Sequence, residues 1–359
     1  MRFHQAKAQH FRLFQHFSFE LHPRLTVIAG ANAAGKTSLL EALYVAARGE
    51  SHRSPTAALA MEGQSTFRIE VIANVGEDLP KDRVEIQWQD RRIGVRVNDQ
   101  AVGLSDLVRR MPVLMLDPHA HRLIEEGPGV RRKFIDWGVF HMEQAFHPTW
   151  RRFQRALKQR NSALRAGASK REVDSWSPEL TATADLLTEQ RKAWLASLLE
   201  IVPPYWARLV DETGWSLGFS QGWREGEPYG ETLIRTLDGD RSAGHTREGP
   251  HRAELRILSD NSLLKERISR GQQKLLIAGL LLAQAELYRR HHDDTPVLLL
   301  DDFAAELSQQ SQQRLMTELE SWPGQSIVTA LDDNPVLASA ADHAMFHVEH
   351  GEITLKKTT

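Results

Sequence analysis

The chain has 359 residues, of which 41% are hydrophobic and 26% are charged, and its formal net charge is −2. This length is enough to bury a large core and fits about two domains. The absence of cysteine excludes disulfides and thiolate metal sites, and the small net charge gives no global electrostatic reason to predict binding to nucleic acid.

The sequence pattern shows no segment that would direct the chain to a membrane. Met1–His10 lacks the apolar run of a signal peptide. The longest apolar stretch, Leu275–Ala283, is about half as long as a membrane-spanning helix requires. We therefore expect a soluble, cytoplasmic protein with no membrane partner.

The first part of the chain predicts two kinds of strand around a glycine-rich turn. Phe17–Leu21 alternates like a half-buried strand, and Leu25–Ala29 is a continuous apolar strand. Thr37–Ala47 then has helical spacing. Val84–Trp88 and Val95–Val102 alternate again, the second with a turn at its Asn-Asp pair, which favours an antiparallel sheet.

Helical patterns dominate from Gly129 to Pro203, and strand patterns return from about Trp215. Val297–Leu300 and Ser326–Thr329 are typical of buried strands. The sequence therefore predicts an α/β core assembled from both chain ends with a helical insertion between them. The expected parts are residues 1–125 (N-terminal part of the core), 126–210 (helical arm) and 211–359 (C-terminal part of the core).

Gly30–Thr37 matches the Walker A pattern G-x-x-x-x-G-K-[ST], in which loop amides bind phosphates. Lys36 would reach the β- and γ-phosphate oxygens as a catalytic residue, and Thr37 would ligate Mg²⁺. The alternative interpretation is a chance glycine turn, which a strand before it and a helix after it disfavour. The candidate ATP-binding residues are Gly30, Ala31, Asn32, Ala33, Ala34, Gly35, Lys36, Thr37 and Ser38.

Val297–Asp302 has the form of a Walker B strand, an apolar run that ends in two acids. Asp301 would join Thr37 in holding Mg²⁺, and Asp302 would be the catalytic carboxylate that positions water. Taken alone the pattern is weak, because buried strands often end at a solvated acid. Together with the Walker A match it predicts a nucleotide site.

Ile268–Lys274 resembles the signature of ABC-type ATPases, S-x-G-Q, at the start of an apolar helix. Ser269, Gly271 and Gln272 would form a second anion-binding surface, which in this class contacts the γ-phosphate of ATP held by a second copy. The alternative is an ordinary helix capped by Ser269. The three motifs in this order predict an ABC-type ATPase that binds ATP and Mg²⁺.

More than 230 residues separate Thr37 from Ser269, which is long for a transporter subunit and short for a long coiled-coil ATPase. With these motifs placed, the chain resembles the RecF family over essentially its full length. The resemblance is carried by His10–Arg12, Gly49–Arg53, Gly127–Asp136 and Gly244–Arg252.

The resemblance implies an ABC-type P-loop ATPase head resembling that of Rad50, with a short helical arm. It further implies an ATP-dependent homodimer on duplex or gapped DNA, and work with RecO and RecR in loading RecA at single-strand gaps. Recombinational repair, the SOS response and replication-fork maintenance are the processes it points to.

The chain departs from the family pattern near the nucleotide. Ala33 stands where a glycine is usual, and Asp302 is shorter than the common glutamate. No Q-loop glutamine occurs around Asp117–His119, and no switch histidine follows Ser326–Thr329. We therefore expect weak, slow, DNA-dependent hydrolysis. Two alternatives stay open: an ATPase coupled to a membrane transporter or other partner, and a non-hydrolysing ATP-dependent binding protein.

Eight Arg and Lys residues and no acid lie between Arg151 and Arg171. On a helix, four of them form a stripe away from the apolar face, and such a stripe would contact DNA phosphates. The alternative is a solvated helix face. His251 and Arg252 are interpreted as a packed histidine and a salt-bridged arginine. The candidate DNA-binding residues are Arg151, Arg155, Lys158 and Arg165.

Overall fold

The computed structural model describes residues 1–74, 80–211, 213–259, 262–263, 268–332 and 334–358. The chain divides into two units. The first unit comprises residues 1–121, 208–210 and 269–359, and the second comprises residues 122–207 and 211–268. Both chain ends therefore build the first unit, and the middle of the chain builds the second.

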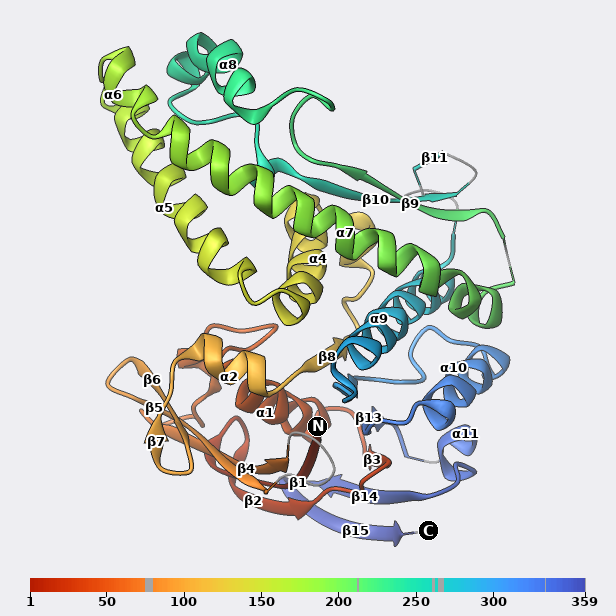
Figure 1. Ribbon diagram of the computed structural model, residues 1–359. Helices are drawn as coiled ribbons and strands as arrows, with labels where there is room; N and C mark the ends of the chain where they lie inside the picture. Colours follow the sequence, from red (N-terminus) through yellow and green to blue (C-terminus); the bar gives the residue numbers. More distant parts are fainter. Residues whose placement is uncertain (75–79, 212, 260–261, 264–267, 333, 359) are drawn as a thin grey trace. The chain divides into compact units, whose positions relative to one another are not determined.

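The first unit contains two six-stranded sheets (Figure 1). One is antiparallel, with strand order β2-β1-β4-β5-β6-β7, and the other has the order β15-β14-β3-β13-β12-β8, parallel except at β15. The strands are β1 (Arg2–Phe11), β2 (Phe14–Glu20), β3 (Leu25–Ala29), β4 (Phe67–Asn74), β5 (Asp82–Gln89), β6 (Arg92–Val97), β7 (Gln100–Ala101), β8 (Val113–Leu116), β12 (Val297–Leu300), β13 (Ser326–Ala330), β14 (His343–Glu349) and β15 (Glu352–Thr358). The helices are α1 (Lys36–Arg48), η1 (Thr56–Leu59), α2 (Leu104–Arg110), α9 (Arg270–His292), α10 (Gln309–Ser321) and α11 (Pro335–Ala338).

The two sheets differ in burial as their sequences predict. Every residue of β3, β12 and β13 is buried, which is why these strands consist mainly of apolar residues, as expected for central parallel strands. In the antiparallel sheet, β6 and β7 are joined through Asn98 and Asp99, whose φ angles of 48° and 66° are those of a two-residue hairpin turn. The expected turn is confirmed.

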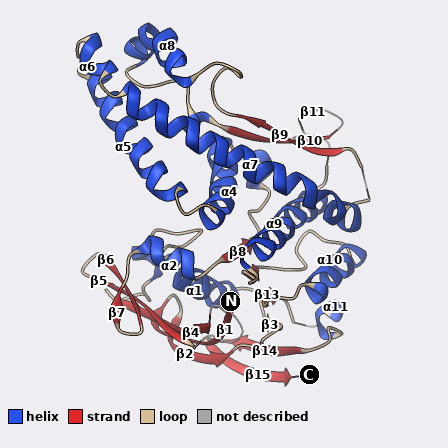
Figure 2. Cartoon of the chain, viewed as in Figure 1, coloured by secondary structure: helices blue, strands red, loops and turns tan. Residues whose placement is uncertain are grey.

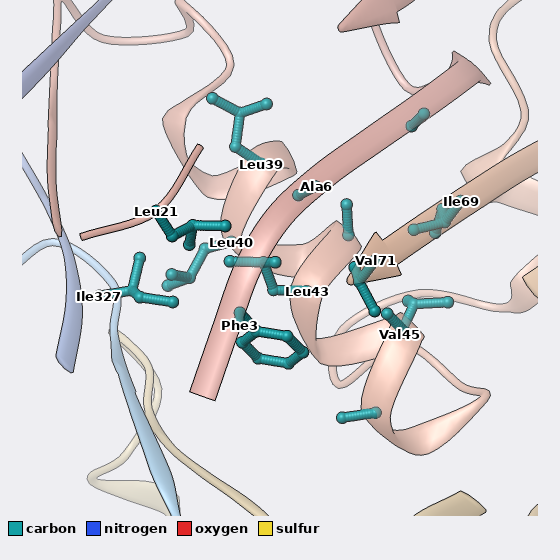
Figure 3. Close-up of a cluster of buried hydrophobic side chains, with 14 of the residues drawn as sticks. Phe3, Ala6, Leu21, Leu39, Leu40, Leu43, Val45, Ile69, Val71 and Ile327 are labelled. Carbon is teal, nitrogen blue, oxygen red and sulfur yellow. The ribbon is translucent and has the colours of Figure 1, made fainter. Parts of the chain in front are cut away.

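Helix α1 is buried between the two sheets. Leu39, Leu40 and Leu43 have no exposed surface, and Figure 3 shows them packed with Phe3 of β1 and Ile327 of β13. A helix with this many buried residues needs such a position between two layers. Its N-terminus, just after β3, is thereby held at the edge where the parallel strands end.

The second unit is mainly helical (Figure 2). Its small antiparallel sheet has the order β11-β10-β9. The helices are α3 (Arg122–Glu125), α4 (Pro128–Met142), α5 (Phe146–Arg165), α6 (Lys170–Asp174), α7 (Ser177–Leu209), α8 (Tyr229–Ala243) and η2 (Pro250–Arg252), and the strands are β9 (Trp215–Ser220), β10 (Glu254–Ser259) and β11 (Ser262–Leu263).

The second unit is larger than the helical arm expected from the sequence, because it includes residues 211–268. A buried ion pair joins this segment to α5. Arg160 donates through Nη1 to Asp240 at 2.8 Å and to Thr246 at 2.6 Å, and neither Arg160 nor Asp240 has exposed surface. Separating such a pair would leave two uncompensated buried charges, so α5 and α8 must pack together.

No helix within the described ranges is long and apolar enough to cross a membrane. The apolar stretch Leu275–Ala283 lies in α9, where all of its residues except Leu281 are buried.

Candidate nucleotide site

The loop between β3 and α1 needs glycine at both of its ends. Gly30 has φ 158° and Gly35 has φ 112°. A Cβ atom would lie 2.4 Å from the carbonyl oxygen of Val348 at Gly30, and 2.7 Å from the ring of Phe14 at Gly35. Both contacts are too short, so close packing as well as backbone conformation requires glycine.

Ala33, in the same loop, has φ 63° in the left-handed region. This conformation costs a residue with a Cβ atom about 1–2 kcal/mol. The replacement of the family's usual glycine therefore leaves the loop with the same kind of turn, held at some cost in strain.

Lys36 and Thr37 begin α1. Lys36 Nζ donates to the carbonyls of Gly30 and Ala31, both at 2.8 Å, and burial lowers its pKa against the opposing effect of Asp302 and Asp301. Thr37 Oγ1 lies 3.0 Å from Asp301 Oδ1. The structure thus brings the Walker A and Walker B residues together across 264 positions of sequence.

The two acids after β12 differ in environment. Asp301 is 2% exposed and accepts a hydrogen bond from Thr329 Oγ1 at 2.6 Å. The same hydroxyl oxygen accepts from the backbone N–H of Asp302 at 2.8 Å. The Asp302 carboxylate has no hydrogen bond or ion pair with any residue in the described ranges. Asp301 is therefore fixed in place, whereas Asp302 is available to another group.

Lys274, which the sequence analysis did not select, holds the loop that contains Asp302. Its Nζ donates to the carbonyls of Asp302 at 2.7 Å, Phe303 at 3.3 Å and Ala305 at 3.0 Å. The side chain is 4% exposed, and burial lowers its pKa against the effect of nearby acids. Asp302 and Glu306 have φ angles of 51° and 65°, so Lys274 stabilises a strained loop.

Ser269 is the N-cap of α9. Its Oγ accepts from the N–H of Gln272 at 3.3 Å, and Gln272 Oε1 accepts from the N–H of Ser269 at 2.7 Å, which is a capping box. A Cβ on Gly271 would lie 2.5 Å from the carbonyl oxygen of Glu306. Within one chain, the segment is thus a helix start capped by Ser269. Ser269 and Arg270 are exposed.

Glu41 of α1 is a second residue that the sequence analysis missed. It has no exposed surface and accepts hydrogen bonds from Arg12 Nε at 2.8 Å, Arg53 Nη2 at 2.8 Å and Ser51 Oγ at 2.5 Å. These contacts outweigh the opposing effect of burial and lower its pKa from 4.5 to about 2. The segments His10–Arg12 and Gly49–Arg53 therefore meet on the helix that follows the Walker A loop.

His347 of β14 is a third residue that the sequence analysis missed. It lies opposite Ala29, the last residue of β3, in the paired strands, and its Nδ1 lies 2.9 Å from Asp332 Oδ1. The segment directly after β13 contains no histidine, but β14 brings His347 to the same sheet edge. Only the pairing of β14 with β3 reveals it.

In the second unit, the Gly127–Asp136 and Gly244–Arg252 segments form one cluster. Asp136 accepts two hydrogen bonds from Arg191, at 2.8 and 3.0 Å, and Arg191 also donates to the carbonyl of Pro250. Burial lowers the pKa of His251 to about 4, which fits a packed histidine. Arg252 is exposed and makes no ion pair within the described ranges, so the expectation of a salt bridge there was wrong.

The four candidate DNA-binding residues are exposed on α5, as a stripe away from Phe153, Leu157 and Leu164, which are buried. No acid described in the structure pairs with any of the four. Arg152, which lies outside the stripe, is paired with Glu179.

A glycine-bounded loop between a parallel strand and a buried helix, facing two acids at the end of the next strand but one in the sheet, defines the head of a P-loop ATPase of the ABC type. Residues 3–354 match the family model described as RecF/RecN/SMC N terminal domain.

Relatives match the chain over nearly its whole length. It is 35% identical to the DNA replication and repair protein RecF of Stenotrophomonas maltophilia, over 98% of this chain and 99% of the relative. It is 37% identical to the RecF of Xanthomonas oryzae, over 96% of both. The chain therefore belongs to the RecF family, and this membership gives no support to a transporter-coupled ATPase.

Solved structures agree with the fold. A structure titled recombination mediator protein RecF-ATPrS in the RecFOR pathway aligns with a TM-score of 0.87 at 22% identity, covering 99% of this chain and 98% of that one. The Smc head domain of Pyrococcus furiosus aligns with a TM-score of 0.59 at 14% identity, covering 99% and 95%.

Proposed function

We propose that the chain binds ATP at the loop between β3 and α1. The observation that carries this proposal is the pairing of a glycine-bounded loop with the Thr37–Asp301 contact of 3.0 Å. Loop amides and the N-terminus of α1 would hold the phosphates of the nucleotide. Lys36 would exchange its two carbonyl partners for phosphate oxygens, which accept more strongly because they are charged.

Thr37 and Asp301 would hold Mg²⁺ with help from the nucleotide. The described ranges contain no group of three or more His, Cys, Asp or Glu side chains suited to a metal. Mg²⁺ commonly takes one or two protein ligands together with phosphates and waters, so a hydroxyl and one carboxylate fit it. When bound, the metal would neutralise charge that develops on the phosphates.

Asp302 would orient the attacking water, because its carboxylate has no other partner in the described ranges. Hydrolysis would be slow, since Asp is shorter than Glu and no Q-loop glutamine is present. The non-hydrolysing alternative remains a second candidate for the same reason. Asp302→Asn separates them: under the hydrolytic hypothesis it traps the ATP-bound dimer, and under the alternative it changes nothing.

Ser269, Gly271 and Gln272 would bind the γ-phosphate of ATP held by a second copy, so that ATP closes a homodimer. Their position at the N-terminus of α9, where Ser269 is exposed and Gly271 and Gln272 are half-buried, supports this assignment. Duplex or gapped DNA would then be held by the dimer, with the stripe on α5 contacting phosphates. By analogy with the relatives, RecO and RecR would be partners in recombinational repair.

Light scattering with Mg-ATP, with and without gapped duplex DNA, tests the dimer. Ser269→Arg places a large cation on the signature surface, and we expect it to abolish dimer formation. Ser169→Arg is the matched control, because Ser169 is the exposed N-cap of α6 and also forms a capping box, with Glu172. Each variant loses one cap, worth about 1 kcal/mol. Equal dimerisation by both variants would refute the trans-signature assignment.

A further inference from the structure

The second unit contains a cavity of about 210 Å³ that the nucleotide chemistry does not use. A single water needs only about 10–15 Å³ of such space, so the cavity is large enough for a group of several heavy atoms. Its walls come from α4, α5, α7 and η2. The wall formed by α4 belongs to the Gly127–Asp136 segment, and the wall formed by η2 belongs to the Gly244–Arg252 segment. The nucleotide site gives neither segment a role.

The cavity is positively charged. Asp136 lies in the wall but is neutralised by its two hydrogen bonds from Arg191. Arg132 lies in the wall with one hydrogen bond, from Nη1 to the carbonyl of Ala253 at 2.8 Å. Burial and the neighbouring Arg191 lower the pKa of Arg132, and a bound anion would counteract this by stabilising the charged guanidinium. Lys133 is exposed and has no partner in the described ranges.

Other wall groups are suited to a planar, hydrogen-bonding ligand. Trp150 is half-buried and offers an indole face, and Gln154 offers an amide with no hydrogen bond in the described ranges. His251 packs near Phe153, with 6.0 Å between ring centroids. Its Nε2 lies 3.0 Å from the carbonyl oxygen of Thr246 and must donate there. Its buried Nδ1, which has no partner, is therefore an acceptor.

The cavity lies beside the exposed stripe of α5. At 100° per residue, Trp150 and Gln154 are about 40° apart around the helix, and Lys158 is about 40° beyond Gln154. Lys158 belongs to the stripe, whereas Phe153 turns toward the buried side. A strand whose phosphates follow the stripe therefore passes the mouth of the cavity.

We propose that this cavity binds one unpaired nucleotide of a DNA strand, with its phosphate at Lys133 and Arg132, its base against Trp150, and the base edge at Gln154 and His251. This inference rests on the proposed DNA-binding function. It adds a means of distinguishing a single-stranded gap from intact duplex, because only an unpaired base can leave the stack to enter.

The test uses the full chain with Mg-ATP and a gapped duplex that carries 2-aminopurine in the gap. Stacking on Trp150 should quench the fluorescence of the probe. Trp150→Leu should abolish the quenching and weaken binding to gapped DNA by about 5-fold or more, without changing binding to intact duplex. Trp150→Phe should restore most of the affinity. Lys133→Gln, at an exposed position, should weaken gapped DNA selectively.

Matched controls lie in the same unit. Trp176→Leu removes a half-buried tryptophan outside the cavity wall, and Lys170→Gln removes an exposed lysine. Neither should alter the probe signal.

If gapped and intact DNA both bind but Trp150→Leu leaves quenching and affinity unchanged, the inference is overturned and the proposed function stands. If neither DNA binds, the proposed function itself fails. If free dAMP competes as strongly as the gapped DNA, the cavity is a free-nucleotide site and the assignment to a strand is overturned.

Discussion

At the scale of single residues, Glu41 shows how charge is buried near the nucleotide site. Its carboxylate is fully buried among Arg12, Arg53 and Ser51. Removing one partner of a buried ion pair typically costs about 3–5 kcal/mol, because the remaining charge keeps its desolvation penalty. Here the partners that would lose this carboxylate, Arg12 and Arg53, are themselves partly exposed.

We expect Glu41→Gln to lower the free energy of unfolding at pH 7 by roughly 3 kcal/mol, the size that a pKa change from 4.5 to about 2 corresponds to. The folded carboxylate has the lower pKa, so its contribution is complete above pH 4.5 and is lost as the pH falls toward 2. Urea unfolding at several pH values measures both effects.

The difference in free energy of unfolding between the wild type and Glu41→Gln should therefore become smaller below pH 4.5. Glu62→Gln is the control, because Glu62 is exposed and has no partner in the described ranges. A difference in free energy of unfolding that stays constant down to pH 2 would contradict the assigned charge state of Glu41.

At the scale of elements, α9 and the loop after β12 act as one piece. Lys274 connects them through three carbonyls, and Gly271 allows the loop to approach the helix. The same helix begins at Ser269, on the exposed signature surface. We therefore expect a change at that surface to reach the backbone of Asp302.

We expect Lys274→Met to lower the rate of ATP hydrolysis by about 10-fold or more, since a methionine of similar length leaves the carbonyls unpaired and the strained loop free to relax. ATP affinity should change less than threefold, about 0.6 kcal/mol, because Lys274 does not contact the Walker A loop. Turnover assays and equilibrium ATP binding measure the two quantities separately.

Lys192→Met is the control for that experiment. Lys192 Nζ donates to Gln221 at 3.0 Å in the second unit, so its loss also removes a lysine hydrogen bond. Similar turnover in both variants would show that Lys274 has no special role in positioning Asp302.

At the scale of the whole molecule, a net charge of −2 conceals a local cationic stripe. Repulsion by the rest of the chain is weak, and the stripe is not neutralised by any acid that the structure describes. Counterion release from DNA is then proportional to the number of phosphates contacted.

Replacing Arg155 and Lys158 together by Gln should reduce the salt slope of duplex binding by about two, at about 0.9 for each lost contact. Fluorescence anisotropy at increasing salt concentration measures the slope. Arg152→Gln is the control, because Arg152 lies on the same helix but is already paired with Glu179. An unchanged slope in the double variant would show that the stripe does not contact DNA and is a solvated helix face.

The sequence by itself determined the features that depend on short stretches of chain. The Walker A loop could be predicted because it needs only eight consecutive residues between a strand and a helix. The buried strands Leu25–Ala29 and Val297–Leu300 could be predicted because central parallel strands are nearly continuous apolar runs. The family segments were also visible, but not what their residues contact.

Tertiary structure decided the contacts between distant residues that no motif predicted. Packing alone brings Arg12 and Arg53 to Glu41, Lys274 to the loop of Asp302, and His347 to Asp332, because no local periodicity encodes these contacts. Residues 211–268 likewise join the second unit through contacts between distant residues, of which the buried pair of Arg160 and Asp240 is one. A charged side chain requires a partner only when the fold buries it away from water, and the sequence alone does not show which charges are buried.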